Sequence, residues 1–170
     1  WVQRPRGPGE VAHSLAHGII PSRLLITLTL SMPEDCSPLY LPLTIGEVVP
    51  EEIDFEVFHK AEISTTSFAA YRGQWLILFF YPADFSFVCP TELGEMADHY
   101  AAFQAEGAEV VSVSTDTAFV HKAWHDQSEL IKKVAFPMAA DPSHELSMMF
   151  GVLNEEEGTA YRGTFIVNPE

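Results

Sequence analysis

The sequence predicts an α/β fold in which a central mixed sheet carries helices on both faces. Strand-like and helix-like patterns alternate along the chain after about residue 50, as they do in α/β proteins. The strand-like run 75–81 is apolar throughout, which is typical of a strand covered on both faces, and 110–114 is interpreted as a second buried strand. At 170 residues the chain suits one domain with room for a hydrophobic core.

The first predicted elements are a short strand, a turn of helix and a strand formed by the longest apolar run. Residues 55–58, Phe-Glu-Val-Phe, are interpreted as a short alternating strand. Residues 67–72 are interpreted as a turn of helix that ends at Gly73. The apolar run 75–81 then predicts a buried strand, and Pro82 ends it because proline has no N–H to donate to a ladder.

A helix is predicted over 90–106. Pro90 suits its first turn, where the missing N–H costs nothing, and Gly107 suits its end. Apolar residues recur along it at helical spacing: Leu93, Met96, Ala97, Tyr100 and Phe103. The run 110–114 predicts the second buried strand.

The remaining elements continue the alternation. They are, in order, a helix over 117–132, a strand over 136–139, a helix opened by Asp141 and running through Phe150, and a turn over 155–158. The last strand is predicted over 164–167, and we expect it to form a hairpin with the segment around Ala160.

The first quarter of the chain has a different character. Residues 1–31 mix Arg, Pro, Gly and His without a helical or strand period, and residues 33–50 are Pro-rich, acidic and expected to be extended. We therefore predict that residues 1–42 are a leader and extended tail outside the fold, and that residues 43–170 form the domain. The chain begins with Trp1, and we expect it to be truncated at both ends.

The charge distribution argues against some partners. The net charge is −15, with +2 on residues 1–31 and −17 on the rest, so nucleic acid and anionic membranes are unfavourable partners for the acidic part. No apolar run reaches the roughly 18–20 residues that span a bilayer. The run 24–30 is short for a signal peptide and lacks a cleavage site, so we expect a cytoplasmic protein.

Two cysteines, Cys36 and Cys89, are too few for a disulfide scaffold or a cysteine-based zinc site. Cys89 lies between a strand that ends at Pro82 and a helix that begins near Pro90. Free N–H groups and the positive end of a helix dipole stabilise a thiolate there. Position alone leaves two interpretations open, a reactive thiolate and a buried apolar residue.

Two neighbours of Cys89 are ambiguous when taken singly. The hydroxyl of Ser86 could face the sulfur or an oxygen bound beside it, although a loop serine is often a turn former. Pro82 fixes the loop entrance and could serve only as a strand terminator.

Taken together, Pro82-x-x-x-Ser86-x-x-Cys89 resembles the peroxiredoxin motif Pro-x-x-x-Thr/Ser-x-x-Cys. The phrase Phe-Tyr-Pro-Ala-Asp-Phe-Ser-Phe-Val-Cys-Pro-Thr-Glu-Leu resembles the bacterial alkyl hydroperoxide reductase C-like branch, of typical two-cysteine type. The resemblance spans about residues 45–170 in the family's order and includes the segments 97–100, 114–117, 121–125 and 162–165.

The resemblance implies a thioredoxin-like fold and a peroxidatic role for Cys89. It also implies that Arg162 points its guanidinium at the thiolate and the peroxide, and that Glu92 orients Arg162. Arginine stays charged and can donate to both peroxide oxygens. From the residues alone, Arg162 could be a solvated charge and Glu92 a first-turn acid favoured by the helix dipole.

The chain departs from this pattern in two ways. Ser86 stands where the branch commonly has threonine, and the loss of the methyl group predicts looser positioning with function retained. Typical members also carry a resolving cysteine in a C-terminal segment. Cys36 lies upstream in the tail and is not assigned that role. Without a resolving cysteine, we expect the chain to stall as a sulfenic acid unless an external thiol rescues it.

The predicted function is therefore a thiol-dependent peroxidase that reduces hydrogen peroxide and organic hydroperoxides. The implied partners are a second copy of the chain, in a homodimer or a decamer, and a flavoprotein disulfide reductase or a thioredoxin-like reductant. No metal or organic cofactor is implied. His121 and His125 have helical metal-site spacing, but no third ligand is evident and packed or exposed histidines are the simpler interpretation.

Three rival functions remain open at this point. The chain could be a one-cysteine peroxidase that relies on a small thiol. It could be a holdase or a peroxide sensor that signals through oxidised Cys89. It could also be a thioredoxin-like binding module without activity, although that would leave the set of Pro82, Ser86, Cys89 and Arg162 unexplained.

Overall fold

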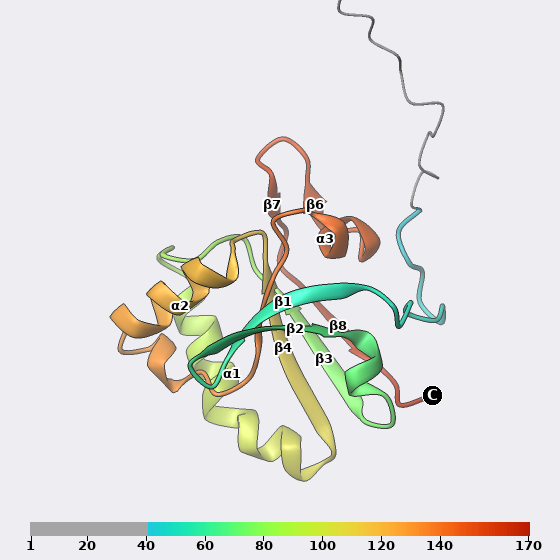
Figure 1. Cartoon of the computed structure of the whole chain (residues 1–170), viewed down its shortest axis with the longest axis horizontal. Coiled ribbons are helices and arrows are strands. Elements are labelled where there is room, and N and C mark those ends of the chain that lie inside the picture. Colours follow the sequence, from blue (N-terminus) through green and yellow to red (C-terminus); the bar gives the residue numbers. More distant parts are fainter. Residues whose placement is uncertain (1–40) are drawn as a thin grey trace, which may run out of the picture. The chain divides into compact units, whose positions relative to one another are not determined.

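The computed structural model describes residues 41–170 (Figure 1). Its strands are β1 (Asp54–His59), β2 (Glu62–Ser67), β3 (Trp75–Phe80), β4 (Ala108–Ser114), β5 (Met138–Ala140), β6 (Leu153–Asn154), β7 (Thr159–Ala160) and β8 (Gly163–Val167). Its helices are η1 (Phe68–Tyr71), α1 (Cys89–Ala105), α2 (Ala118–Gln127), η2 (Ile131–Lys133) and α3 (Glu145–Met149). Cys36 and nearly all of the predicted leader lie outside the described residues, and the predicted domain boundary at residue 43 stays a prediction.

A mixed sheet of six strands forms the centre, in the order β2-β1-β5-β4-β3-β8. Strands β3 and β5 run parallel to β4, whereas β8 is antiparallel to β3 and β1 is antiparallel to both β2 and β5. The short strands β6 and β7 form a separate hairpin. The predicted α/β fold with a mixed sheet is therefore confirmed.

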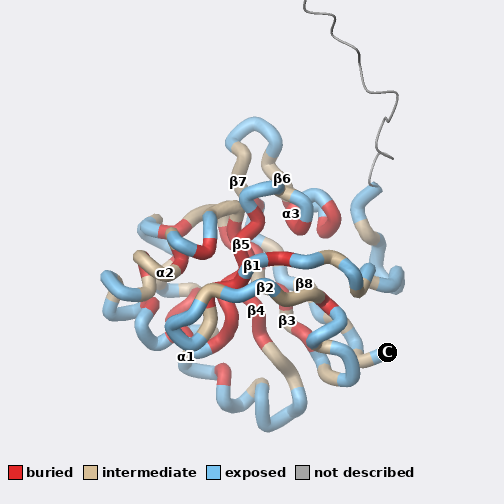
Figure 2. The backbone as a smooth tube through the Cα atoms, in the orientation of Figure 1, coloured by how far each residue is buried: buried red, intermediate tan, exposed pale blue. Residues whose placement is uncertain are grey.

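Two hydrophobic clusters lie on opposite faces of this sheet. One joins side chains of α1, α2 and η2 to the sheet, and the other joins α3, η1 and parts of residues 43–53. Figure 1 shows α1 and α2 on one side of the strands and α3 on the other, so the prediction of helices on both faces holds. The most buried stretches follow the central strands (Figure 2).

Strand β3 consists of apolar residues, and its position in the sheet explains why. Alternate residues of a strand point to opposite faces, and here both faces are covered. One set packs into the α3 cluster and comprises Leu76, Leu78 and Phe80. The other packs into the α1 and α2 cluster and comprises Ile77, Phe79 and Tyr81.

The second long helix is shorter than the sequence predicts. The expected helix over 117–132 ends at Gln127, and Ser128 is extended, with φ −100° and ψ 121°. The Ser128 hydroxyl accepts a hydrogen bond from the N–H of Ile131 at 3.4 Å. Such local side-chain bonds compete with helical hydrogen bonding, and the chain resumes as η2.

The predicted hairpin between the last strand and the Ala160 segment is wrong. Ala160 belongs to β7 and pairs with Leu153 of β6, whereas β8 pairs with β3 along its whole length. The apolar strand β3 would otherwise be left with an open edge. Strand β8 covers that edge, and its Phe165 packs against the rings of Phe80 and Phe150, with ring centroids 5.6 and 4.9 Å away.

None of the helices within residues 41–170 is long and apolar enough to cross a bilayer.

Candidate active site

Cys89 is the first residue of α1 and a free thiol. The preceding loop leaves the sheet after Tyr81, whose N–H makes one more ladder bond, to the carbonyl of Val113 at 3.0 Å. Pro90 lies in the first turn of α1, as the sequence predicts. Cys89 is only 1% exposed, so its sulfur lies beneath the surface at a helix N-terminus. Both backbone N–H groups and the helix dipole favour negative charge at this position.

Arg162 reaches Cys89 from the far end of the chain. It directly precedes β8, and the pairing of Gly163 with Phe80 brings it to the edge of the sheet from which the cysteine loop departs. Its Nη2 lies 3.6 Å from the Cys89 sulfur. The Arg162 side chain is 45% exposed, so it lies partly in solvent beside the buried sulfur.

Glu92 fixes the orientation of that guanidinium. The Nε–H of Arg162 donates to both carboxylate oxygens of Glu92, each 3.0 Å away. Glu92, through its hydrogen bond and its charge, and to a smaller extent Cys89, raise the pKa of Arg162 above its usual value. The cation therefore lies between a carboxylate and the sulfur, which is an arrangement that stabilises a thiolate.

Ser86 and Pro82 lie in the loop between β3 and α1. Within the described residues, neither makes a hydrogen bond to Cys89. The Ser86 hydroxyl donates to the carbonyl of Ala83 at 3.0 Å, so its proton serves the loop and its lone pairs remain free to accept. This geometry matches the interpretation of Ser86 as a turn former. Pro82 is partly buried and follows the last residue bonded to the β4 ladder.

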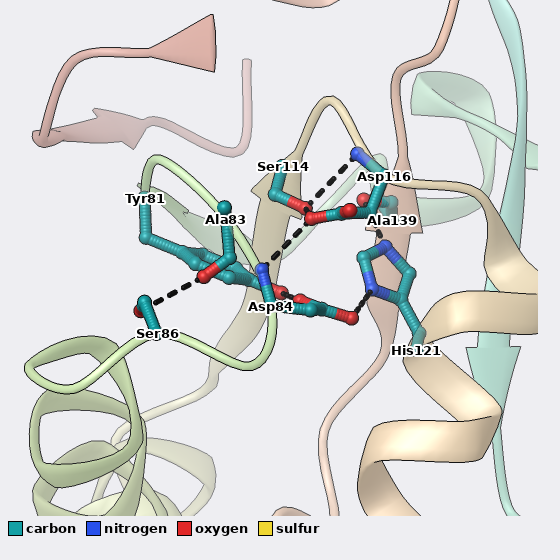
Figure 3. A network of polar contacts seen from close by, with 8 residues as sticks. All are labelled: Tyr81, Ala83, Asp84, Ser86, Ser114, Asp116, His121 and Ala139. Atoms are coloured by element: carbon teal, nitrogen blue, oxygen red, sulfur yellow. Dashed lines mark hydrogen bonds and ion pairs between the residues drawn. The ribbon is translucent and has the colours of Figure 1, made fainter.

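The structure adds a buried polar network that the sequence analysis did not anticipate (Figure 3). Asp84 accepts from the Tyr81 hydroxyl at 2.6 Å, and its other oxygen lies 2.7 Å from Nδ1 of His121. Nε2 of His121 lies 3.1 Å from the carbonyl of Ala139. Asp84 and His121 are 37 residues apart, and no local pattern indicates that they meet.

Both ring nitrogens of His121 are thus engaged within the protein, which excludes it as a metal ligand in this structure. His125 instead packs its ring edge-on against Phe58, with centroids 5.2 Å apart. Residues 41–170 contain no group of three or more metal-ligating side chains.

The model of the AhpC/TSA family matches residues 45–170. Among curated relatives, alkyl hydroperoxide reductase C of Bacillus subtilis (strain 168) is 52% identical over 124 residues, which cover 73% of this chain and 65% of that protein. The chain therefore spans slightly less than two thirds of the length of this relative.

Solved structures agree with this match. A crystal structure of Enterococcus faecalis AhpC is 52% identical, with a TM-score of 0.68, and the match covers 71% of this chain and 73% of that one. Mycobacterium tuberculosis AhpC is 34% identical, with a TM-score of 0.69, over 76% of this chain and 78% of that one. These likenesses confirm the predicted thioredoxin-like fold and the predicted resemblance. The chain belongs to the AhpC/TSA family.

Proposed function

We propose that the chain is a thiol peroxidase that reduces hydrogen peroxide and organic hydroperoxides through Cys89. The observation that carries the proposal is the placement of the Arg162 guanidinium 3.6 Å from the buried Cys89 sulfur, with Glu92 holding its other edge. A helix N-terminus and a permanent cation at one sulfur favour the nucleophilic thiolate. The family match supports the same activity.

In the proposed reaction the thiolate attacks the terminal oxygen of a hydroperoxide. An S–O bond forms as the O–O bond breaks, and the sulfur gives up two electrons to the peroxide. The terminal oxygen, with its proton, stays on Cys89 as a sulfenic acid. The other oxygen leaves as an alkoxide or hydroxide and takes a proton from solvent, forming an alcohol or water.

Arg162 has two tasks in this reaction. It stabilises the thiolate before attack, and its N–H groups donate to the oxygens on which charge develops as the O–O bond breaks. Pro82 shapes the entrance of the loop, and the lone pairs of Ser86 accept from a proton on the bound peroxide. Glu92 keeps the guanidinium from rotating away.

The sulfenic acid must then be reduced by a thiol. We propose a flavoprotein disulfide reductase or a thioredoxin-like protein as the reductant, and a homodimer or a decamer as the working assembly. We also propose the cytoplasm as its location, because the domain does not rely on a disulfide scaffold. No metal or organic cofactor takes part in the proposed chemistry.

The test compares Cys89→Ser with Cys36→Ser in peroxide consumption with a small dithiol as reductant. We expect Cys89→Ser to lose consumption and Cys36→Ser to keep it, with sulfenic acid trapped by a dimedone probe on Cys89 alone. Stopped-flow measurement of the first oxidation separates a peroxidase from a sensor or holdase. A Cys89→Ser protein that still turns over rapidly would refute the proposal, and a slow first oxidation of the parent chain would favour the rival functions.

A further inference from the structure

We propose that Asp84 and His121 are positioning residues, which hold the loop before Cys89 in the geometry that Arg162 requires. The proposal rests on the proposed function, because the readout of that geometry is the reaction of Cys89 with peroxide. Neither residue touches the sulfur. They act through the loop of residues 81–88, which joins β3 to α1.

Asp84 and His121 are fully buried, and their side chains are hydrogen-bonded within the protein. The side chains of Asp84 and His121 are both 0% exposed. Nε2 of His121 faces the Ala139 carbonyl at 3.1 Å, and Nδ1 faces an oxygen of the Asp84 carboxyl group at 2.7 Å. With the Tyr81 hydroxyl on the other oxygen of Asp84, each polar side-chain atom of the pair has a hydrogen-bond partner.

Asp84 is anchored through its backbone as well as its side chain. Its N–H donates to Oδ2 of Asp116 at 2.8 Å, and the Ser114 hydroxyl donates to the same oxygen at 2.9 Å. The middle of the loop is therefore tied to the ends of β3 and β4 and to α2 (Figure 3). Breaking one of these bonds would leave a buried polar group unsatisfied, at about 1–3 kcal/mol.

The residue after Asp84 shows why the loop needs such an anchor. Phe85 has a φ of +53°, in the left-handed region, where a residue with a side chain pays roughly 1–2 kcal/mol. Strain of this kind persists only where the surroundings fix it. Trp124 of α2 lies one turn after His121 and contacts the Phe85 ring, with centroids 6.0 Å apart. Helix α2 thus holds two consecutive loop residues.

Cys89 follows this strained turn closely. The Ser86 hydroxyl closes the turn on Ala83, and Val88 then begins α1 by accepting the N–H and the hydroxyl of Thr91. A loop released at Asp84 would shift the start of α1 and with it the sulfur. Displacements of about 1 Å at a reacting group can cost about 100-fold in rate.

The test uses three variants of the full chain. Asp84→Ala removes the anchor. Asp84→Asn can keep every bond, because its amide oxygen accepts from Tyr81 and its amide N–H donates to a neutral His121. Ser147→Ala is the matched control, because it deletes a buried hydroxyl that donates to a different carboxylate, Asp141, at 2.6 Å. The readouts are the second-order rate of Cys89 oxidation by hydrogen peroxide and amide hydrogen exchange.

We expect Asp84→Ala to slow oxidation by about 10- to 100-fold and to raise exchange over residues 82–92. Asp84→Asn should keep the parent rate and exchange. Ser147→Ala should raise exchange around α3 without changing the rate. A purely structural role would leave the rate of folded Asp84→Ala unchanged, which would overturn the proposal, as would an Asp84→Asn protein that loses as much as Asp84→Ala.

If Asp84→Ala does not fold, His121→Gln removes the hydrogen bond from α2 to Asp84 while the bonds to Tyr81 and Asp116 remain, and we expect a smaller loss of rate with the same local rise in exchange. Parent-like values in that variant would overturn the proposal. If the parent chain does not react with peroxide, the proposed function fails, and the exchange of residues 82–92 alone decides the positioning role.

Discussion

At the scale of single residues, Arg162 has the most exacting geometry. Its Nε–H is shared between the two oxygens of Glu92, while Nη2 faces the Cys89 sulfur. Only a planar guanidinium with donors on two edges can face both groups in these directions. A lysine ammonium has one nitrogen, which cannot occupy both positions.

Arg162→Lys should therefore slow the oxidation of Cys89 by hydrogen peroxide. The loss of one charge-assisted hydrogen bond, about 1.5–3 kcal/mol, predicts a rate about 10- to 100-fold lower. Stopped-flow kinetics measures the rate. Arg72→Lys is the matched control, because Arg72 pairs with Glu51 and takes no part in the site. An Arg162→Lys rate equal to that of the parent would contradict the role of the guanidinium.

His59 predicts a pH dependence of stability that is separate from the active site. Burial, and then the charge of Lys60, lower the pKa of His59 below its usual 6.5. Between the lowered pKa and about 6.5, the unfolded chain binds more protons than the folded one, so the free energy of unfolding falls as the pH falls through this window. Above pH 6.5 the pKa difference of His59 no longer acts, so the free energy of unfolding has its full value there.

Urea titrations over this pH range test the effect. His59→Gln should weaken the acid-side fall in the free energy of unfolding, and His99→Gln, at an exposed position of α1, controls for the loss of one histidine. If the parent and His59→Gln fall in parallel, the histidine does not contribute.

Sequence reasoning found the residues around Cys89 because they are contiguous and lie at a strand-to-helix junction. It reached Arg162 only through resemblance, because 73 residues separate the arginine from the cysteine. It missed the contact between Asp84 and His121 for the same reason. Each of these residues has an ordinary local context, and only the fold brings them together.

At the scale of elements, local patterns located β3, β4 and α1 to within a residue or two, because apolar runs and helical spacing depend on neighbours in the sequence. They gave the wrong partner for β8, and they missed β2 entirely. β2 pairs with β1 through a two-residue turn in which Lys60 and Ala61 have φ values of 51° and 67°. Two-residue hairpin turns of this kind usually contain Asn-Gly or Asp-Gly, and this one contains neither.

Replacing Lys60-Ala61 by Asn-Gly should stabilise the protein. Both residues of the turn lie in the left-handed region, where each ordinary side chain costs roughly 1–2 kcal/mol, and Asn-Gly relieves part of that cost. We expect the free energy of unfolding, measured by urea titration, to rise by about 1 kcal/mol. Ala69→Gly in η1, where φ is not positive, is the control and should not stabilise. A destabilised Asn-Gly variant would show that the turn is not strained.

At the scale of the whole molecule, the dominant feature is the net charge of −15. Like charges on a compact chain repel each other and reduce stability. Part of this charge lies in the turn between β6 and β7, where Glu155, Glu156 and Glu157 are consecutive and exposed. Figure 2 shows this turn among the exposed parts of the backbone.

Raising NaCl from about 0.01 to about 0.15 M should therefore increase the free energy of unfolding, because the screening length falls from about 30 to about 8 Å. Urea is the suitable denaturant, since it adds no ions. A variant with glutamine at positions 155–157 should start more stable and respond less to salt. If salt destabilises the parent, ion pairs outweigh the repulsion and the inference from net charge is wrong.

The distance along the chain between the sulfur and its guanidinium also has a consequence during synthesis. Cys89 leaves the ribosome 73 residues before Arg162. Until β8 has been made and has joined the edge of β3, the nascent cysteine lacks its cation and should react with oxidants as an unassisted thiol. The order of translation should therefore delay the reactivity that we propose for Cys89 until Arg162 and β8 have been made.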